Sequence, residues 1–252
     1  MNLTDRVDNT QLINLARQQY EVKQQSKLPS VIVKLPSNGK VYPSTHPLAS
    51  GTIEMRYMTA YDEDILTNAS YIREGVVFDK LLESIIITPV KISEISEVDK
   101  DGLIINARIL AYGSDYPVSV TDPKTNKQLE RVVNLSNIQN LPFDLINDEN
   151  GEFTYSFPEF EIKFSFYHLK PKDNSSTISG LLKQIICEVN GDRTEKAIEQ
   201  FIRYEFLSYE SKKFRLYYAT NTPKLDMNYT FEGEDGDTFK STFPINTDFF
   251  WF

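Results

Sequence analysis

Residues 58–90 constrain the fold most strongly, because start signals, apolar periodicity and stop signals agree along this stretch. Thr59 stands at an N-cap position, where its side chain can accept a hydrogen bond from an exposed amide of the first helical turn. Acidic residues at positions 62–64 follow in that turn, and their negative charge suits the positive end of the helix dipole. The pattern predicts a short helix that ends near Leu66.

A second, longer helix is predicted from about residue 71 to residue 87. Residues 68–70 supply a turn and an N-cap for it, and Pro89 closes it. Its apolar residues recur at steps of three and four, so one face is expected in the core and the other in solvent. The apolar set is Val77, Leu81, Leu82, Ile85 and Ile86.

The segments on either side of these helices predict a small hairpin and a third core helix. Residues 31–35 are rich in β-branched side chains and lead into a tight turn at Asn38 and Gly39. Residues 52–57 alternate apolar and polar side chains, so we expect them to pair with this first strand. Residues 101–112 have the apolar density of a buried helix that ends before a glycine.

Residues 1–27 predict an N-terminal helix or arm that precedes the main domain. An apolar stripe beside a Gln-rich face indicates an amphipathic helix over about residues 4–25. Such a helix either packs on its own domain or docks on a partner, since terminal elements are often ordered only by contact.

Three further segments alternate apolar and polar residues on both sides of a polar turn, as β-hairpins do. They lie near residues 116–138, 151–169 and 227–250. Helices are predicted between the second and third of these signals, over residues 177–189, 194–207 and 209–220. The chain is therefore expected to have an α+β fold, with a helical core and several antiparallel β-hairpins.

Charge and cysteine content argue against several classes of protein. The chain has 36 acidic and 27 basic residues, and its formal charge of -9 has the wrong sign for a general nucleic-acid binder. A single cysteine, Cys187, argues against an internal disulfide or a cysteine-rich zinc site. The N-terminus lacks the apolar core of a signal peptide, and no apolar run reaches the roughly 20 residues of a spanning helix. We therefore expect a cytoplasmic protein that contacts no membrane.

Sequence motifs for catalysis, phosphate binding and metal binding are absent. The sequence has no Gly-rich phosphate loop, no HExxH and no nucleophile elbow, and its two histidines, His46 and His168, nominate no triad. Acidic residues at 232–237 lack the spacing of a calcium loop. The aromatic residues of 151–169 lack the basic neighbours that base stacking needs, so they are expected in the core. We expect no enzyme activity, no cofactor and no metal.

Four sequence blocks resemble the baseplate hub assembly family of T4-like tailed bacteriophages. The blocks are LPSNGKVYP at 35–43, MTAYDEDILTN at 58–68, EGVVFDKLLESII at 74–86 and FPINTDFFWF at 243–252. The resemblance implies one α+β domain over residues 28–252. In relatives the turns of the hairpins near 116–138 and 227–250 often carry Cys-x-x-Cys pairs, which implies zinc-ribbon-like knuckles. Both turns lack cysteine here, so these knuckles are expected to be held by cross-strand packing without metal.

The resemblance implies a protein that works by protein–protein contacts with phage baseplate hub subunits. A chaperone-like assembly factor is preferred, because the chain lacks the repetitive β architecture of tail-tube and spike proteins; such a factor acts in the host cytoplasm. The first alternative is a structural hub subunit that stays in the virion baseplate. A remote alternative is a tail-associated hydrolase. The oligomeric state stays open.

The C-terminal residues Phe250, Trp251 and Phe252 are the candidate partner-binding residues. Together with Phe249 they make four consecutive aromatic side chains, and alternate side chains of a strand point to opposite sides. Either the tail is sandwiched inside its own fold, or the outward pair forms an apolar anchor for a hub subunit.

Overall fold

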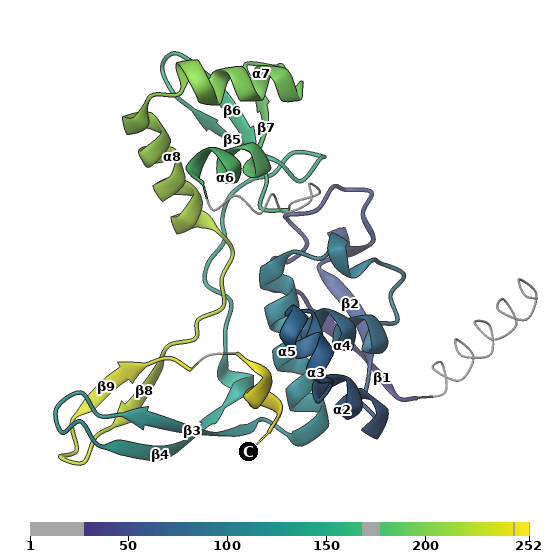
Figure 1. Cartoon of the computed structure of the whole chain (residues 1–252), viewed down its shortest axis with the longest axis vertical. Helices are drawn as coiled ribbons and strands as arrows, with labels where there is room; N and C mark the ends of the chain where they lie inside the picture. Colours follow the sequence, from purple (N-terminus) through teal and green to yellow (C-terminus); the bar gives the residue numbers. More distant parts are fainter. Residues whose placement is uncertain (1–27, 168–176, 244, 252) are drawn as a thin grey trace, which may run out of the picture.

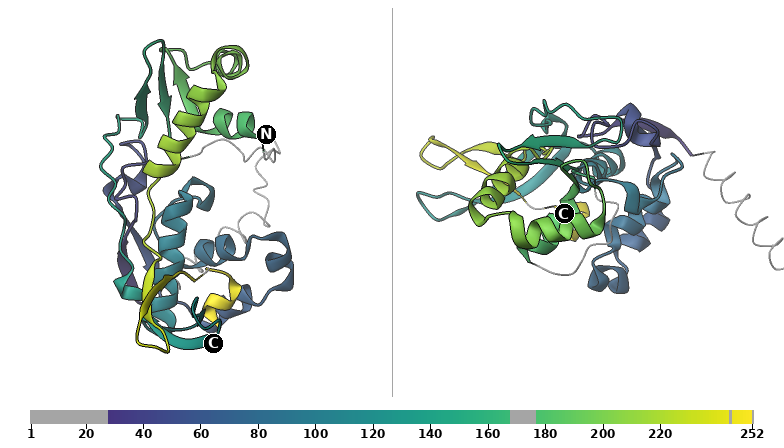
Figure 2. Two further views of the ribbon diagram at one scale, coloured as in Figure 1. Left: turned by 90° about the vertical axis from the view of Figure 1, so that its left-hand side faces the viewer. Right: turned by 90° about the horizontal axis from the view of Figure 1, so that it is seen from above.

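The computed structural model describes residues 28–167, 177–243 and 245–251, and in this part the chain forms three lobes (Figure 1). Residues 28–112 form a helical lobe. Residues 113–138, 227–243 and 245–251 form a hairpin lobe beside it. Residues 142–167 and 177–223 form an inserted lobe at the far end of the molecule, and Figure 2 shows that this lobe projects beyond the other two. The predicted N-terminal helix or arm, residues 1–27, lies outside the described residues.

A two-stranded antiparallel sheet opens the helical lobe, as predicted. It consists of β1 (Ser30–Lys34) and β2 (Thr52–Arg56), with Val33 opposite Ile53. The predicted turn is confirmed at Asn38 and Gly39, whose φ angles of 51° and 78° are left-handed. Glycine is required at position 39, because a Cβ there would lie 2.5 Å from the carbonyl oxygen of Ala49. A short 3-10 helix, Pro47–Ser50, returns the chain to β2.

The predicted short helix is confirmed as α2 (Ala60–Leu66), which begins with a capping box between Thr59 and Asp62. The prediction of a single helix over residues 71–87 is wrong. The chain forms two helices there, α3 (Ala69–Glu74) and α4 (Val77–Ile85). The break falls at Gly75, which ends α3 with a left-handed φ of 71°. Helices often end at such a glycine, because only glycine enters this conformation without a steric penalty.

The third core helix is α5 (Glu97–Tyr112), which follows a 3-10 turn at Ile92–Glu94. It begins earlier than predicted, because the Ser96 side chain accepts a hydrogen bond from the Asp99 amide as N-cap. It ends before Gly113, as expected. A bridge between Met55 of β2 and Ile86 ties the end of α4 to the sheet.

Two of the predicted hairpins are confirmed, and they make up the hairpin lobe. One consists of β3 (Asp115–Thr121) and β4 (Gln128–Asn134), and a 3-10 turn at Leu135–Asn137 follows it. The other consists of β8 (Tyr229–Glu232) and β9 (Thr238–Ser241). The Asp122 carboxylate accepts a hydrogen bond from the Glu234 amide at 3.3 Å, so the two turns lie against each other. The zinc-ribbon likeness of these hairpins stays a prediction.

The inserted lobe contains the third predicted hairpin, β5 (Phe153–Ser156) and β6 (Glu161–Phe164), extended by β7 (Ile186–Val189). The prediction of a helix through residue 189 is wrong, since α6 (Ile178–Ile185) ends where β7 begins. Pairing of Ile162 with Val189 overrides the local helical pattern. Cys187 therefore lies on a strand.

The C-terminal half of the inserted lobe is helical. It contains α7 (Glu195–Gln200), a π-helical turn at Phe201–Glu205 and α8 (Ser208–Asn221). Phe153, Phe164 and Phe214 are almost completely buried in this lobe, as the aromatic pattern predicted. Paired backbone segments connect the lobe to the rest of the chain, with the Leu141 amide donating to the Lys224 carbonyl at 2.9 Å. Over the described residues, no helix combines the length and the apolar content needed to cross a membrane.

Candidate partner-binding surfaces

The C-terminal aromatic residues do not form a strand. Thr247–Phe250 is a 3-10 helix, so the alternation expected of a strand does not apply. Phe249 and Phe250 are both completely buried, whereas the Trp251 side chain is 37% exposed. Phe252 lies outside the described residues. Phe250 is therefore sandwiched inside its own fold, and Trp251 is the candidate of this group that the structure shows at the surface.

Arg108 holds this tail in place. Its Nε donates a hydrogen bond to the Phe249 carbonyl at 3.2 Å, and its guanidinium lies 4.9 Å from the centre of the Tyr112 ring. Burial lowers the pKa of Arg108, and the rings of Tyr116 and Tyr112 oppose this shift. The sequence signal for this role is a single cation inside the apolar helix 101–112.

Aromatic contacts join the tail to two lobes. Phe249 packs on Tyr116 of β3, with ring centres 4.9 Å apart. Phe250 packs on Phe78 of α4, with ring centres 6.2 Å apart. The tail is therefore the seam between the hairpin lobe and the helical lobe.

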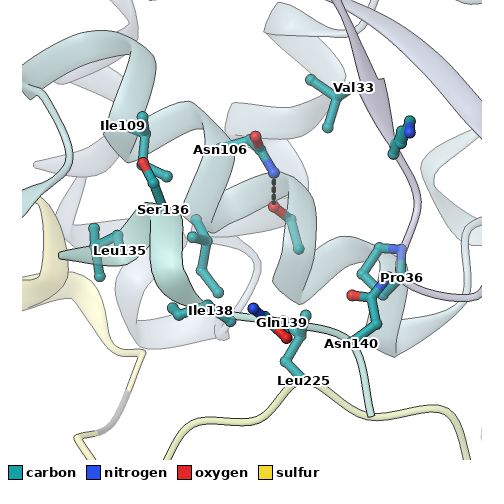
Figure 3. Close-up of a pocket in the computed structure, with 13 residues that line it drawn as sticks. Val33, Pro36, Asn106, Ile109, Leu135, Ser136, Ile138, Gln139, Asn140 and Leu225 are labelled. Carbon is teal, nitrogen blue, oxygen red and sulfur yellow. Dashed lines mark hydrogen bonds between the residues drawn. The ribbon is translucent and has the colours of Figure 1, made fainter. Parts of the chain in front are cut away.

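An open groove of about 600 Å³ lies between β1, α5 and the segment that leaves the hairpin lobe (Figure 3). Val33 and Pro36 line one side, and Ile109 of α5 contributes an apolar wall. Gln139 and Asn140 add amide side chains from the segment that follows β4. The groove therefore combines apolar walls with hydrogen-bonding groups, as sites for peptide segments do.

One edge of β1 faces this groove without a partner strand. In the described part of the chain, β1 pairs with β2 and with no other strand. The Tyr57 amide donates to the Pro29 carbonyl, and the Leu35 amide donates to the Gly51 carbonyl. Because bonded positions alternate in an antiparallel pair, the amides of Ile32 and Lys34 point to the other edge. Residues of β1 line the groove and none of β2 does, so the groove lies on this free side.

His46 is oriented by its surroundings. Its ring stacks on Tyr42 with centres 4.8 Å apart, and its Nδ1 accepts a hydrogen bond from the Leu48 amide. Burial lowers the pKa of His46. The Tyr42 hydroxyl donates to Asp99 at 2.6 Å, so this cluster packs the lobe and holds no nucleophile beside the imidazole. His168 lies outside the described residues.

No group of three or more His, Cys, Asp or Glu side chains that could hold a metal occurs within residues 28–167, 177–243 and 245–251.

Comparison with known proteins gives one match. The family model described as T4 bacteriophage base plate protein matches residues 28–251. No curated protein and no solved structure matches the chain.

Proposed function

The chain belongs to the T4 bacteriophage base plate protein family, and we propose that it acts as an assembly factor of the baseplate hub. In this role it binds hub subunits in the host cytoplasm through protein–protein contacts, carries out no catalytic step, and leaves before the particle is complete. The small size of its sheets supports the proposal, because those described have two or three strands. A tail-tube or spike protein would instead be expected to have a repetitive β architecture.

The groove beside the free edge of β1 carries this proposal. An extended segment of a hub subunit can pair its backbone with the amides of Ile32 and Lys34, as in other cases of strand addition. Apolar side chains of that segment would contact Ile109 and Leu225, which line the groove. Unpaired strand edges are commonly covered or blunted in proteins, so an open edge beside a groove indicates a place for a partner.

Two variants of one residue test the groove. Lys34→Pro removes an amide on the free edge and leaves the pairing between β1 and β2 intact, because edge strands tolerate proline where the N–H faces outward. Lys34→Ala removes the same side chain and keeps the amide. We expect purified hub subunits to co-purify with the Lys34→Ala protein and not with the Lys34→Pro protein, while both variants keep the wild-type melting temperature.

Equal binding by the two variants would contradict strand addition. If Lys34→Pro lowers the melting temperature, Ile109→Arg provides a second way to obstruct the groove from α5. The assembly role is tested separately in infected cells that lack the protein, where hub subunits are expected to accumulate unassembled. Normal hub assembly in those cells would contradict the role.

A further inference from the structure

The inserted lobe carries exposed apolar and basic side chains along α8 and the turn before it. Four large apolar side chains are 64–73% exposed there: Tyr204, Leu207, Tyr209 and Leu216. Lys212 and Lys213 are also exposed. These six residues are called the basic–apolar face below.

Helical spacing brings the α8 members of this face together. Tyr209, Lys213 and Leu216 are three or four residues apart, so they follow one side of the helix. The opposite side is turned inward, and Phe214 there is completely buried. Figure 1 shows α8 on the flank of the inserted lobe that points away from α2–α5. The face is therefore open along the length of the helix.

Within the described residues, the cations of this face form no ion pair with a carboxylate. In the described part of the chain, lysines such as Lys163 and Lys183 form ion pairs, with Asp148 and Glu199. No such ion pair involves Lys212 or Lys213. Lys213 lies over the Tyr209 ring, with its Nζ 4.5 Å from the ring centre. The positive charge is thus presented to solvent on a chain whose formal charge is -9.

We propose that the basic–apolar face docks on an acidic surface of another baseplate protein, one that presents carboxylates around an apolar centre. Charge complementarity selects an acidic partner, and exposed Tyr side chains are typical of residues that dominate interface energies. A protein is favoured over a nucleic acid because Leu207 and Leu216 offer no ring for base stacking.

The size of the face fits the centre of an interface. A helix of 14 residues is about 21 Å long, so one side of α8 offers on the order of 200 Å². A standard interface buries about 800 Å² on each partner, so the remaining contact must come from neighbouring elements. The partner class rests on the proposed function, whereas the position and charge of the face do not.

Binding of full-length protein to purified baseplate subunits tests the face. Lys212→Glu/Lys213→Glu is expected to weaken binding to one subunit at least tenfold, and wild-type binding should weaken as salt is raised. Tyr209→Ala/Leu216→Ala should weaken it by a similar factor at an unchanged melting temperature, since both side chains are exposed. The charge-matched control Lys80→Glu/Lys91→Glu, in the helical lobe, should bind within twofold of wild type.

Zero-length carbodiimide cross-linking gives a direct readout, because it joins lysine to carboxylates in contact. We expect Lys212 or Lys213 cross-linked to Asp or Glu of the bound subunit. Unchanged binding by Lys212→Glu/Lys213→Glu overturns the face and leaves the proposed function standing. The face is also overturned if the wild-type protein self-associates, or binds a single-stranded oligonucleotide, and Lys212→Glu/Lys213→Glu abolishes that binding. If wild type binds no baseplate subunit, the face and the proposed function both fail.

Discussion

The helical lobe and the hairpin lobe use charged residues in opposite ways. In the helical lobe, Asp62 and Asp99 are completely buried. Asp62 accepts hydrogen bonds from both terminal nitrogens of Arg56, at 2.7 and 2.9 Å. In the hairpin lobe the ion pairs are at the surface, where Lys124 pairs with Asp237 and the side chains are 60% and 64% exposed. The buried carboxylate of this lobe, Asp122, accepts hydrogen bonds from the Lys124 and Glu234 amides.

Because of this difference, the stability of the helical lobe should depend more on its charged residues than the stability of the hairpin lobe does. Buried carboxylates tolerate no loss of their partners, because the remaining charge or donor cannot turn to water. Exposed ion pairs contribute little, since water and salt screen them. The hairpin lobe instead depends on ring contacts such as that between Tyr116 and Phe243, whose ring centres are 5.4 Å apart. We therefore expect substitutions of charged residues to destabilise the protein strongly in the helical lobe and weakly in the hairpin lobe.

The largest effect is expected when the buried pair of the helical lobe is broken. Asp62→Ala leaves Arg56 buried and also removes the acceptor for the Thr59 amide and the Ser84 hydroxyl. Removing one partner of a buried pair costs about 3–5 kcal/mol, and this should appear as a fall in the urea midpoint. Asp79→Ala, at a carboxylate that is 49% exposed, is the control and should have little effect. Equal losses for the two variants would contradict the importance of the buried pair.

Acid should act on the same pair. Burial tends to raise the pKa of Asp62, but hydrogen bonds from Arg56, Thr59 and Ser84 outweigh it, so the pKa lies below its usual value. Because this pKa is lower in the folded state, the stabilisation is present above the unfolded pKa of about 4 and is lost as pH falls through the folded one. When the pH is lowered from 7, the urea midpoint should start to decrease below about pH 4, and the decrease should be smaller in Asp62→Ala.

The next largest loss of stability is expected at the C-terminal tail, which joins the helical lobe and the hairpin lobe. Phe250→Ala should destabilise the protein by about 3–5 kcal/mol, because it empties a completely buried ring site against Phe78. Trp251→Ala should have a much smaller effect, since this side chain is 37% exposed. Co-purification with hub subunits tests whether Trp251 anchors a partner. If Trp251→Ala loses hub binding at an unchanged melting temperature, Trp251 is an anchor; a large fall in melting temperature would instead place it in the core.

A null result is expected for the ion pairs of the hairpin lobe. Lys124→Ala/Lys127→Ala removes the contacts to Asp237 and Glu234, both at the surface. The melting temperature should stay the same within error, with and without added salt. A clear fall would mean that these charges, and not the ring contacts, join the two hairpins.

The smallest effect is expected from a chelator. Neither hairpin turn contains cysteine, so the purified protein should hold less than stoichiometric zinc and keep its melting temperature in EDTA. Elemental analysis that finds about one zinc per chain would overturn this prediction.

Local signals predicted much of the fold correctly. The capping box at Thr59, the N-cap at Asn68 and the three hairpin turns all depend on residues close together in sequence. Two misses arose where a nearby alternative was stronger. Gly75 interrupts an otherwise continuous apolar pattern. The predicted helix ends at residue 185, because residues 186–189 form β7 and pair with β6.

The candidate surfaces were less accessible to sequence reasoning. Arg108 meets the Phe249 carbonyl 141 positions away, and no local pattern encodes such a contact. The groove also needs residues from β1, α5 and the connection after β4. For the tail, a strand was assumed where the chain forms a 3-10 helix, so alternation along a strand could not decide between a buried and an exposed Phe250. Only the basic and aromatic character of α8 was visible in advance.

Quantitative mass spectrometry of purified virions, compared with hub intermediates from infected cells, tests the central claim most directly. An assembly factor should be found bound to hub subunits in the intermediates and should be absent from the virions. Detection in virions at the stoichiometry of the other baseplate proteins would contradict this account and identify the chain as a structural subunit of the baseplate.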